Sequence, residues 1–375
     1  MNGMLPSTNR DRQRSGTVPA GLSGRRARGP AFATGPPRPI LADMTKLSLL
    51  DLAHVTETGT VRDALANAAD IARHAEALGF ERYWCAEHHG MEGIASAATS
   101  VVIGHVAAAT STIRVGAGGI MLPNHAPLVI AEQFGTLDAL HPGRIDLGLG
   151  RAPGSDQRVA AALRRNLNTD PNAFPRDVVE LQSYFANDGR TGIAATPGAG
   201  ANVQLYILGS SLFGAQVAAM LGLPYAFASH FAPQALDEAL ATYRERFEPS
   251  DVLSEPYAIC GYNVFAADTE DEAQLLASSM QQSCVRLRTG KPGKLPPPVE
   301  GYRESLPPQA AAMLDGVLSA TAIGTPSQVR DQMNAFVERT QADELILAGS
   351  IYDHEARKRS LTLAARAFQA ERAAA

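Results

Sequence analysis

The sequence predicts an α/β protein built as a closed (β/α)8 TIM barrel. From Lys46 onward, short β-rich runs alternate with longer helical patterns, which is typical of a parallel sheet covered by helices. An open doubly wound sheet is disfavoured, because the first strand and the residues after it, LSLLDLAHVTETGT, contain no GxGxxG phosphate-binding sequence. Eight strands in one series over roughly 320 residues therefore favour a closed barrel.

The predicted strands follow one another in chain order. Each is a short apolar or alternating run bounded by turn residues. The eight strands cover residues 47–53, 81–87, 113–122, 144–150, 203–209, 224–230, 257–267 and 343–349.

Helical patterns fill the intervals between the strands. In VRDALANAADIARHAEALG (61–79), apolar residues recur at three- and four-residue spacing, and Gly79 stands where a helix C-terminal cap is expected. Further helices are predicted over 95–109, 127–140, 176–187, 213–221, 232–248, 269–285, 326–340 and 352–370.

A Pro- and Gly-rich stretch from Arg288 to Pro308 interrupts this alternation. It predicts a long excursion after the seventh strand, near the end of the barrel where catalytic loops lie.

The composition indicates a globular domain with an N-terminal extension. Hydrophobic residues make up 45% of the 375 residues and charged residues 19%, which is sufficient for a sizeable core. Residues 1–43 carry seven arginines against two acids among many Gly, Pro and Ser. We expect this segment to be disordered and to precede a single barrel domain over 44–375. An upstream translation start, with Met44 opening the domain, is favoured over an Arg-rich transit peptide.

Charge and cysteine content narrow the class of protein further. The net charge of −5, with acids and bases scattered along the chain, gives no reason to expect a nucleic-acid partner. The three cysteines lie far apart and form no CxxC pair, which favours a reduced cytoplasmic compartment over a disulfide scaffold. No apolar run approaches the roughly 20 residues that span a bilayer, so we expect no membrane partner.

Two adjacent histidines, His88 and His89, end the second predicted strand in AEHHG. Chemistry in such barrels gathers at the C-terminal ends of the strands, and a near-neutral pKa suits proton transfer. A metal would need more ligands, and His54 and His230 follow other strands. However, no HxH or HxxxH spacing is present, and Glu87 is expected to face away from His88. We favour a proton-handling or cofactor-facing role over a metal site or a purely structural one.

Two strand ends could bind an anion. In GRIDLGLGRAPGSD, glycines let a ligand approach the backbone, and Arg151 offers a fork of donors for phosphate. In LYILGSSLFG, Gly209, Ser210 and Ser211 lead directly into a helix, whose unpaired N–H groups attract anions. A solvated arginine and an ordinary serine N-cap are the structural alternatives.

The third strand contains the paired glycines Gly118 and Gly119. Paired glycines weaken a strand, so they mark a bulge or a place where a ligand presses against the backbone.

Together these stretches resemble the bacterial luciferase-like flavin-dependent monooxygenases, and most of all their branch of unassigned substrate. The likeness covers essentially the whole chain from Met44 to about Ala370. It rests on AEHHG, IRVGAGGIMLPNHAPLVIAEQFGTLDALHPGRIDLGLGRAPGSD and LYILGSSLFGAQVAAMLGLPYAFASHF, which occur in the family's order.

The resemblance implies a (β/α)8 barrel of the luciferase-like type, usually a homodimer, that binds reduced FMN (FMNH2) or, in some branches, the deazaflavin F420. The FMN users oxidise a small organic substrate with O2 and typically receive FMNH2 from a separate flavin reductase. His88 matches the catalytic histidine, and His89 is expected to be structural. Gly118 and Gly119 match a non-proline cis peptide under the flavin ring. The residues that match the phosphate site are Arg151, Gly209, Ser210 and Ser211.

Three positions depart from the family pattern. Gly150 replaces a reactive cysteine, which makes light emission a poor expectation. Phe213 replaces a phosphate-binding threonine, so phosphate binding must rely more on Arg151, Ser210 and backbone N–H groups. His54 stands where close relatives carry a proline, which affects the first loop and the substrate pocket.

Three functions remain open from the sequence. The favoured one is an FMNH2-dependent monooxygenase, and the alternatives are an F420-dependent hydride-transfer enzyme and a non-catalytic flavin-binding barrel.

Overall fold

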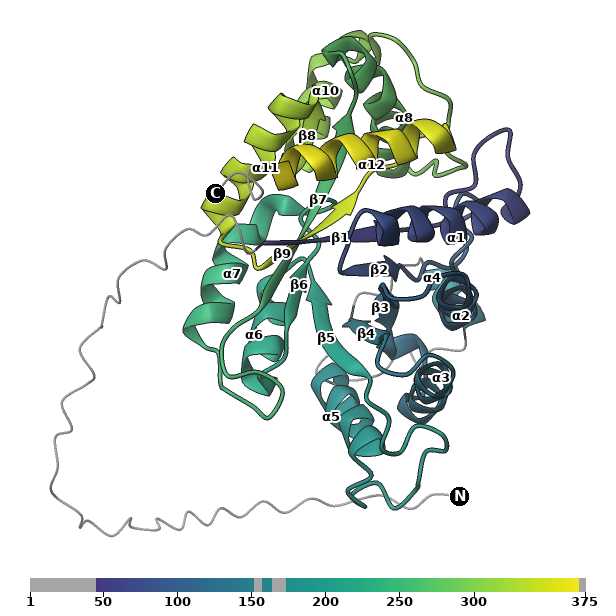
Figure 1. The fold of residues 1–375 in the computed structure, drawn as a ribbon, viewed down its shortest axis with the longest axis vertical. Coiled ribbons are helices and arrows are strands. Elements are labelled where there is room, and N and C mark those ends of the chain that lie inside the picture. Colours follow the sequence, from purple (N-terminus) through teal and green to yellow (C-terminus); the bar gives the residue numbers. More distant parts are fainter. Residues whose placement is uncertain (1–44, 152–156, 164–172, 371–375) are drawn as a thin grey trace, which may run out of the picture. The chain divides into compact units, whose positions relative to one another are not determined.

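The structure is a computed structural model that describes residues 45–151, 157–163 and 173–370. Its centre is a ring of eight parallel strands (Figure 1). Each strand pairs with the next along the chain from β1 to β7, β7 pairs with β9, and β9 closes the ring on β1. The predicted (β/α)8 barrel is confirmed. The ring strands are β1 Lys46–Asp51, β2 Arg82–Cys85, β3 Arg114–Met121, β4 Ile145–Gly150, β5 Gln204–Gly209, β6 Tyr225–Phe227, β7 Ala258–Ala266 and β9 Glu344–Ala348.

A ninth strand, β8 Thr321–Gly324, lies outside the ring and pairs only with β7. This strand was not predicted from the sequence, because its four residues carry almost no periodicity. The excursion after β7 is consequently longer than the predicted stretch ending at Pro308, since it also contains β8 and the helix before it. The nine residues of β7 make this possible, because the strand pairs with β9 up to Asn263 and with β8 from Asn263 onward.

Helices surround the ring, and most follow the predicted spans to within a few residues. Helix α1 begins at Thr60, whose hydroxyl accepts a hydrogen bond from the Asp63 N–H while Asp63 bonds back to the Thr60 N–H. Gly79 follows its end with φ of 76°, as predicted for a C-terminal cap. The helices are α1 Val61–Ala77, α2 Thr99–Ala109, α3 Pro127–Leu140, α4 Gln157–Ala162, α5 Ala173–Ala186, α6 Leu212–Leu221, α7 Leu236–Glu245, α8 Glu270–Arg288, α9 Tyr302–Ser305, α10 Pro308–Val317, α11 Pro326–Thr340 and α12 His354–Gln369.

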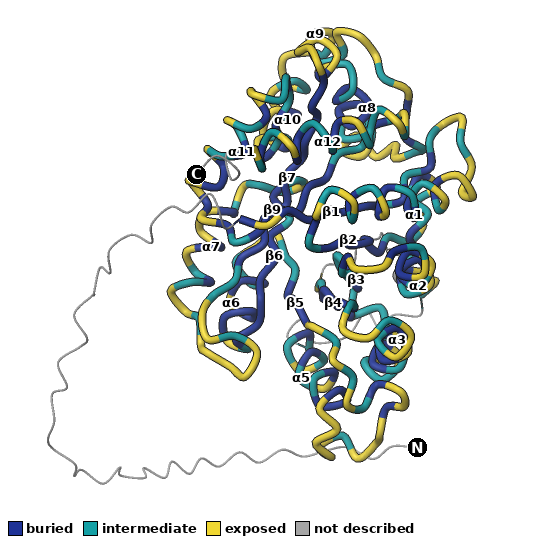
Figure 2. The backbone as a smooth tube through the Cα atoms, viewed as in Figure 1, coloured by how far each residue is buried: buried dark blue, intermediate teal, exposed yellow. Residues whose placement is uncertain are grey.

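The core has two layers separated by the ring of strands. The larger layer lies between the strands and the helices, and the smaller fills the barrel interior. Figure 2 shows the strands buried and the outer faces of the helices exposed. Side chains alternate between these layers along each strand, because successive residues point to opposite faces of a sheet. The interior layer consists of Leu50, Trp84, Ala86, Tyr206, Ala226, Ile259, Ile346 and Ala348.

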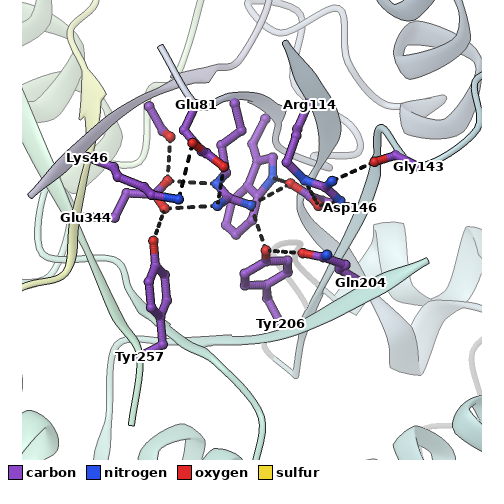
Figure 3. Close-up of polar contacts among 12 residues, drawn as sticks. Lys46, Glu81, Arg114, Gly143, Asp146, Gln204, Tyr206, Tyr257 and Glu344 are labelled. Carbon is purple, nitrogen blue, oxygen red and sulfur yellow. Dashed lines mark hydrogen bonds and ion pairs between the residues drawn. The ribbon is translucent and has the colours of Figure 1, made fainter. Parts of the chain in front are cut away.

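A buried ion cluster closes the N-terminal end of the barrel interior (Figure 3). The guanidinium of Arg82 donates to both carboxylate oxygens of Glu344, at 2.8 and 3.0 Å, and to Asp146 Oδ2 at 2.8 Å. Trp84 and Arg114 also donate to Asp146, and Ser48 and Tyr257 also donate to Glu344. Burial opposes the charge on Arg82, but the two carboxylates outweigh burial and raise the pKa of Arg82. The cluster joins β2, β4 and β9, which are far apart in the sequence.

Residues 1–43, for which a disordered extension was predicted, lie outside the described residues, so that prediction and the domain division stay untested. Among the described residues, no helix is both long and apolar enough to cross a membrane.

Replacing Arg82 by alanine should destabilise the barrel strongly. The substitution leaves Glu344 buried without its counter-ion and leaves Asp146 with Arg114 alone, which costs about 3–5 kcal/mol of unfolding free energy. Urea denaturation of both proteins measures the difference. Arg303→Ala is the control because its partner Asp315 and Arg303 itself are exposed, and its midpoint should not change. Equal midpoints for Arg82→Ala and wild type would contradict the structural role of the cluster.

Candidate functional site

Polar side chains gather at the C-terminal ends of the barrel strands. His88 follows β2, His54 follows β1 and His230 follows β6. Repulsion from His88 contributes to lowering the pKa values of His54 and of His230, so His88 lies within electrostatic reach of both. The closed ring brings the C-terminal ends of the strands together at one mouth of the barrel, as expected for this fold.

His88 has an imidazole that is available for chemistry. Its Nδ1 atom is buried and has no hydrogen-bond partner in the described structure. Burial lowers the pKa of His88, Glu87 opposes this shift and His89 adds to it. The ring is therefore neutral at neutral pH and keeps one nitrogen that can accept a proton or a hydrogen bond. A buried polar atom without a partner is unusual in a protein interior, and it marks a place where a ligand can bind.

Glu87 is turned into a hydrogen-bonding cluster rather than simply away from His88. Its carboxylate accepts hydrogen bonds from His89 Nε2 at 2.7 Å and from His125 Nε2 at 2.9 Å. Among the described residues, these three form one of two groups whose ligand atoms lie within 4.8 Å of one another, close enough to hold a metal. His88, His54 and His230, the set considered from the sequence, belong to neither group.

The paired glycines of β3, Gly118 and Gly119, lie where the β3 backbone packs closely against β4. This close contact is called the glycine crossing. The Gly118–Gly119 peptide bond is cis, as the sequence analysis expected. The register between β3 and β4 shifts between Ala117 and Ile120, which agrees with the first of the two predicted alternatives, a bulge or a place of ligand contact. A Cβ atom on Gly119 would lie 2.6 Å from the carbonyl oxygen of Gly148, and one on Gly118 would lie 2.8 Å from Leu50 Cδ1. Neither position has room for a side chain.

The two predicted anion-binding stretches lie side by side, because β4 and β5 pair up to Gly150 and Leu208. Ser211 caps the N-terminus of α6 without a side-chain cap hydrogen bond, so both its hydroxyl and the first N–H groups of the helix remain available. Ser210 and Ser211 are exposed. Such a turn can accept a phosphate.

Arg151 stacks on Phe213, with its guanidinium carbon 4.0 Å from the ring centroid. From the sequence, Phe213 was notable only as the replacement of a phosphate-binding threonine. The structure gives this residue a positive role, since the aromatic ring at the start of α6 holds Arg151 beside the Ser210–Ser211 turn. The residues after Arg151, up to Asp156, lie outside the described part of the chain.

The hydrogen-bonded pair of His54 and Ser350 also lies at the C-terminal mouth of the barrel, and it was not predicted from the sequence. Ser350, which follows β9, lies with its hydroxyl 2.7 Å from His54 Nε2. Burial, followed by the charge of Arg357, lowers the pKa of His54 to about 4. No sequence spacing connects positions that are almost 300 residues apart, so only the departure of His54 from the family pattern could have drawn attention to it.

These residues fit a phosphate-bearing flavin. The unpartnered His88 nitrogen supplies a proton-handling group, and the Ser210–Ser211 turn supplies an anion site. Gly118 and Gly119 add a backbone segment without side chains.

Comparison with known proteins gives one consistent result. Residues 45–344 match the family model described as luciferase-like monooxygenase. A luciferase-like monooxygenase of Escherichia coli K12 is 52% identical over 318 residues, which cover 84% of this chain and 95% of that protein. The N-acetyl-S-alkylcysteine monooxygenase of Bacillus subtilis is 34% identical over 281 residues, covering 73% of this chain and 80% of the relative.

Solved structures share the fold. The crystal structure of apo-MsnO8 superposes with a TM-score of 0.78 at 36% identity, covering 87% of this chain and 98% of that one. The oxygenating component of 3,6-diketocamphane monooxygenase from Pseudomonas putida, in complex with FMN, has a TM-score of 0.65 at 16% identity over 86% and 97% of the two chains. An F420-dependent secondary alcohol dehydrogenase has a TM-score of 0.61 at 16% identity over 85% and 99%.

Two neighbouring glycines of β4 should respond differently to alanine. A Cβ on Gly148 would collide with the carbonyl oxygen of Ala117, whereas on Gly150 the nearest atom would be 3.8 Å away. We expect Gly148→Ala to lower the unfolding free energy by about 1–3 kcal/mol and Gly150→Ala to leave it nearly unchanged. Thermal or urea unfolding measures both, and equal effects would show that the β3–β4 crossing is looser than described.

Acid should destabilise the protein through the mouth histidines. Burial lowers the pKa values of His54 and His230 from 6.5 to about 4. Below pH 6.5 these two histidines become protonated in the unfolded chain but stay neutral in the folded protein. The free energy of unfolding therefore falls as the pH drops from about 6.5 to about 4. Urea unfolding across this range should show a shallower decline for His230→Asn than for wild type. An identical decline would mean that His230 is not buried as a neutral ring.

Proposed function

Because the chain belongs to the luciferase-like monooxygenase family, we propose that it is a flavin-dependent monooxygenase that uses reduced FMN and O2 to oxidise a small organic substrate. The observation that carries the proposal is the buried, unpartnered Nδ1 of His88 at the same barrel mouth as the β3 glycine crossing. The fold of an FMN-bound monooxygenase supports it.

Each part of the site has a role in this proposal. Arg151, Ser210 and Ser211 would hold the phosphate of FMN, and the backbone of Gly118 and Gly119 would lie against its ring. Reduced FMN supplies the electrons that activate O2. His88 is neutral at neutral pH, so it can take up a proton from the reacting groups and return it.

The partners follow from the same proposal. A separate flavin reductase would deliver FMNH2, and the protein would act as a homodimer in the cytoplasm. The N-acetyl-S-alkylcysteine monooxygenase relative makes a thioether a reasonable first substrate probe.

A second candidate cofactor is F420, because an F420-dependent dehydrogenase shares the fold. The site would then transfer hydride without O2. A flavin-binding barrel without catalysis is the third possibility, and an O2-uptake assay distinguishes it from the first.

Replacing His88 by alanine should abolish oxygenation while leaving the fold and flavin binding intact. We expect a loss on the order of 10²–10⁴-fold, the usual contribution of a positioned acid–base group. The measurement is O2 uptake and sulfoxide formation with a flavin reductase, FMN and N-acetyl-S-benzylcysteine, beside aldehyde and ketone probes. His105→Ala, an exposed residue of α2, is the control. Full activity of His88→Ala would remove the role assigned to this residue.

Anaerobic titration of the protein with reduced FMN, oxidised FMN and F420 distinguishes between the two candidate cofactors. We expect reduced FMN to bind more tightly than oxidised FMN and more tightly than F420. Tighter binding of F420 would favour the hydride-transfer enzyme.

A further inference from the structure

Glu87 touches the backbone of β3 on both sides of Ile120. Its own N–H donates to the carbonyl oxygen of Gly119 at 3.3 Å. Its carboxylate oxygen Oε2 accepts a hydrogen bond from the N–H of Met121 at 2.9 Å. Through these two bonds, one residue fixes the strand segment that follows the glycine crossing. The same residue immediately precedes His88, so it connects the two halves of the candidate site.

Two histidines hold the Glu87 carboxylate in place. Glu87 is only 1% exposed, and such a buried charge needs donors. His89 Nε2 lies 2.7 Å from Oε1, and His125 Nε2 lies 2.9 and 3.0 Å from the two oxygens. Asn124 adds a longer contact of 3.4 Å. Burial favours protonation of Glu87, but the hydrogen bonds outweigh it and lower the pKa of Glu87, so the group is a carboxylate at neutral pH.

We propose that Glu87, held by His89 and His125, is a positioning residue that sets the β3 backbone from Gly119 to Met121 relative to His88. The proposal rests on the proposed function, because the quantity that it controls is the distance between the bound flavin and the His88 imidazole. Among the described residues, no hydrogen bond joins the Glu87 carboxylate to the His88 imidazole. Glu87 acts on β3 through its two hydrogen bonds to the β3 backbone. It acts on His88 through the peptide bond that joins the two residues.

The same three side chains could alternatively hold a divalent metal. The hydrogen bonds favour the positioning role, because each histidine already satisfies the carboxylate through Nε2 and Met121 N–H occupies one of its oxygens. Zinc would require both Nε2 atoms to lose their protons and to move apart around the ion. The metal is therefore an outcome that the experiment must be able to report.

The test compares wild type with Glu87→Gln and with two His89 variants. Reduced FMN is titrated anaerobically, and the reoxidation of bound flavin by O2 is followed by visible absorbance. For Glu87→Gln we expect binding of reduced FMN about tenfold weaker, as for loss of a hydrogen bond to a charged group, and faster reoxidation. His89→Gln keeps an amide donor for Glu87 and should resemble wild type, whereas His89→Ala should resemble Glu87→Gln. A general loss of stability would not produce this difference in flavin binding and reoxidation between His89→Gln and His89→Ala.

Asp70→Asn provides the matched control. Asp70 also bonds a histidine, His354, at 2.9 Å, but this pair joins α1 to α12 and is partly exposed. The Asp70→Asn variant should bind reduced FMN and reoxidise it as wild type does.

Three results would overturn the inference. Wild-type binding and reoxidation in Glu87→Gln would do so while leaving the proposed function intact. A stoichiometric metal in the purified protein, lost in His125→Ala, would replace positioning by metal binding. If wild type binds no reduced flavin at all, the proposed function falls and this inference falls with it.

Discussion

The closed barrel depends on one buried arginine. Arg82 lies inside the ring with two carboxylates, Asp146 and Glu344, that come from strands 64 and 262 residues away. A buried charge cluster of this kind is tolerated only when every member is paired, so the cluster favours the register in which β2, β4 and β9 meet. It lies at the N-terminal end of the strands, where barrels gain stability. The other end is thereby left free to carry polar groups that are incompletely paired.

The contrast between the two ends explains where chemistry can occur. At the N-terminal end, Arg82 and its carboxylates use almost all of their hydrogen-bonding capacity. At the C-terminal end, His88 and His230 each keep a buried Nδ1 atom without a partner in the described structure. Burial also keeps these rings neutral. A neutral imidazole with a free nitrogen can accept a proton, so this end of the barrel can support acid–base chemistry.

The sequence predicted what depends on local pattern and missed what depends on contacts across the fold. Strand order and the bulge at Gly118–Gly119 follow from periodicity and from the lack of side chains. The short strand β8 has too few residues to show a period. The stacking of Arg151 on Phe213 and the bonds from His125 to Glu87 join segments that only the closed ring brings together. The family resemblance predicted a role for His88, but it did not draw attention to Glu87, which hydrogen-bonds to the β3 backbone.

The most direct test of the flavin site is the electron density of a crystal soaked with FMN. The account predicts the flavin ring against the Gly118–Gly119 backbone with His88 beside it, and the phosphate between Arg151 and the Ser210–Ser211 turn. Flavin density at another place on the barrel, or a phosphate remote from that turn, would contradict it.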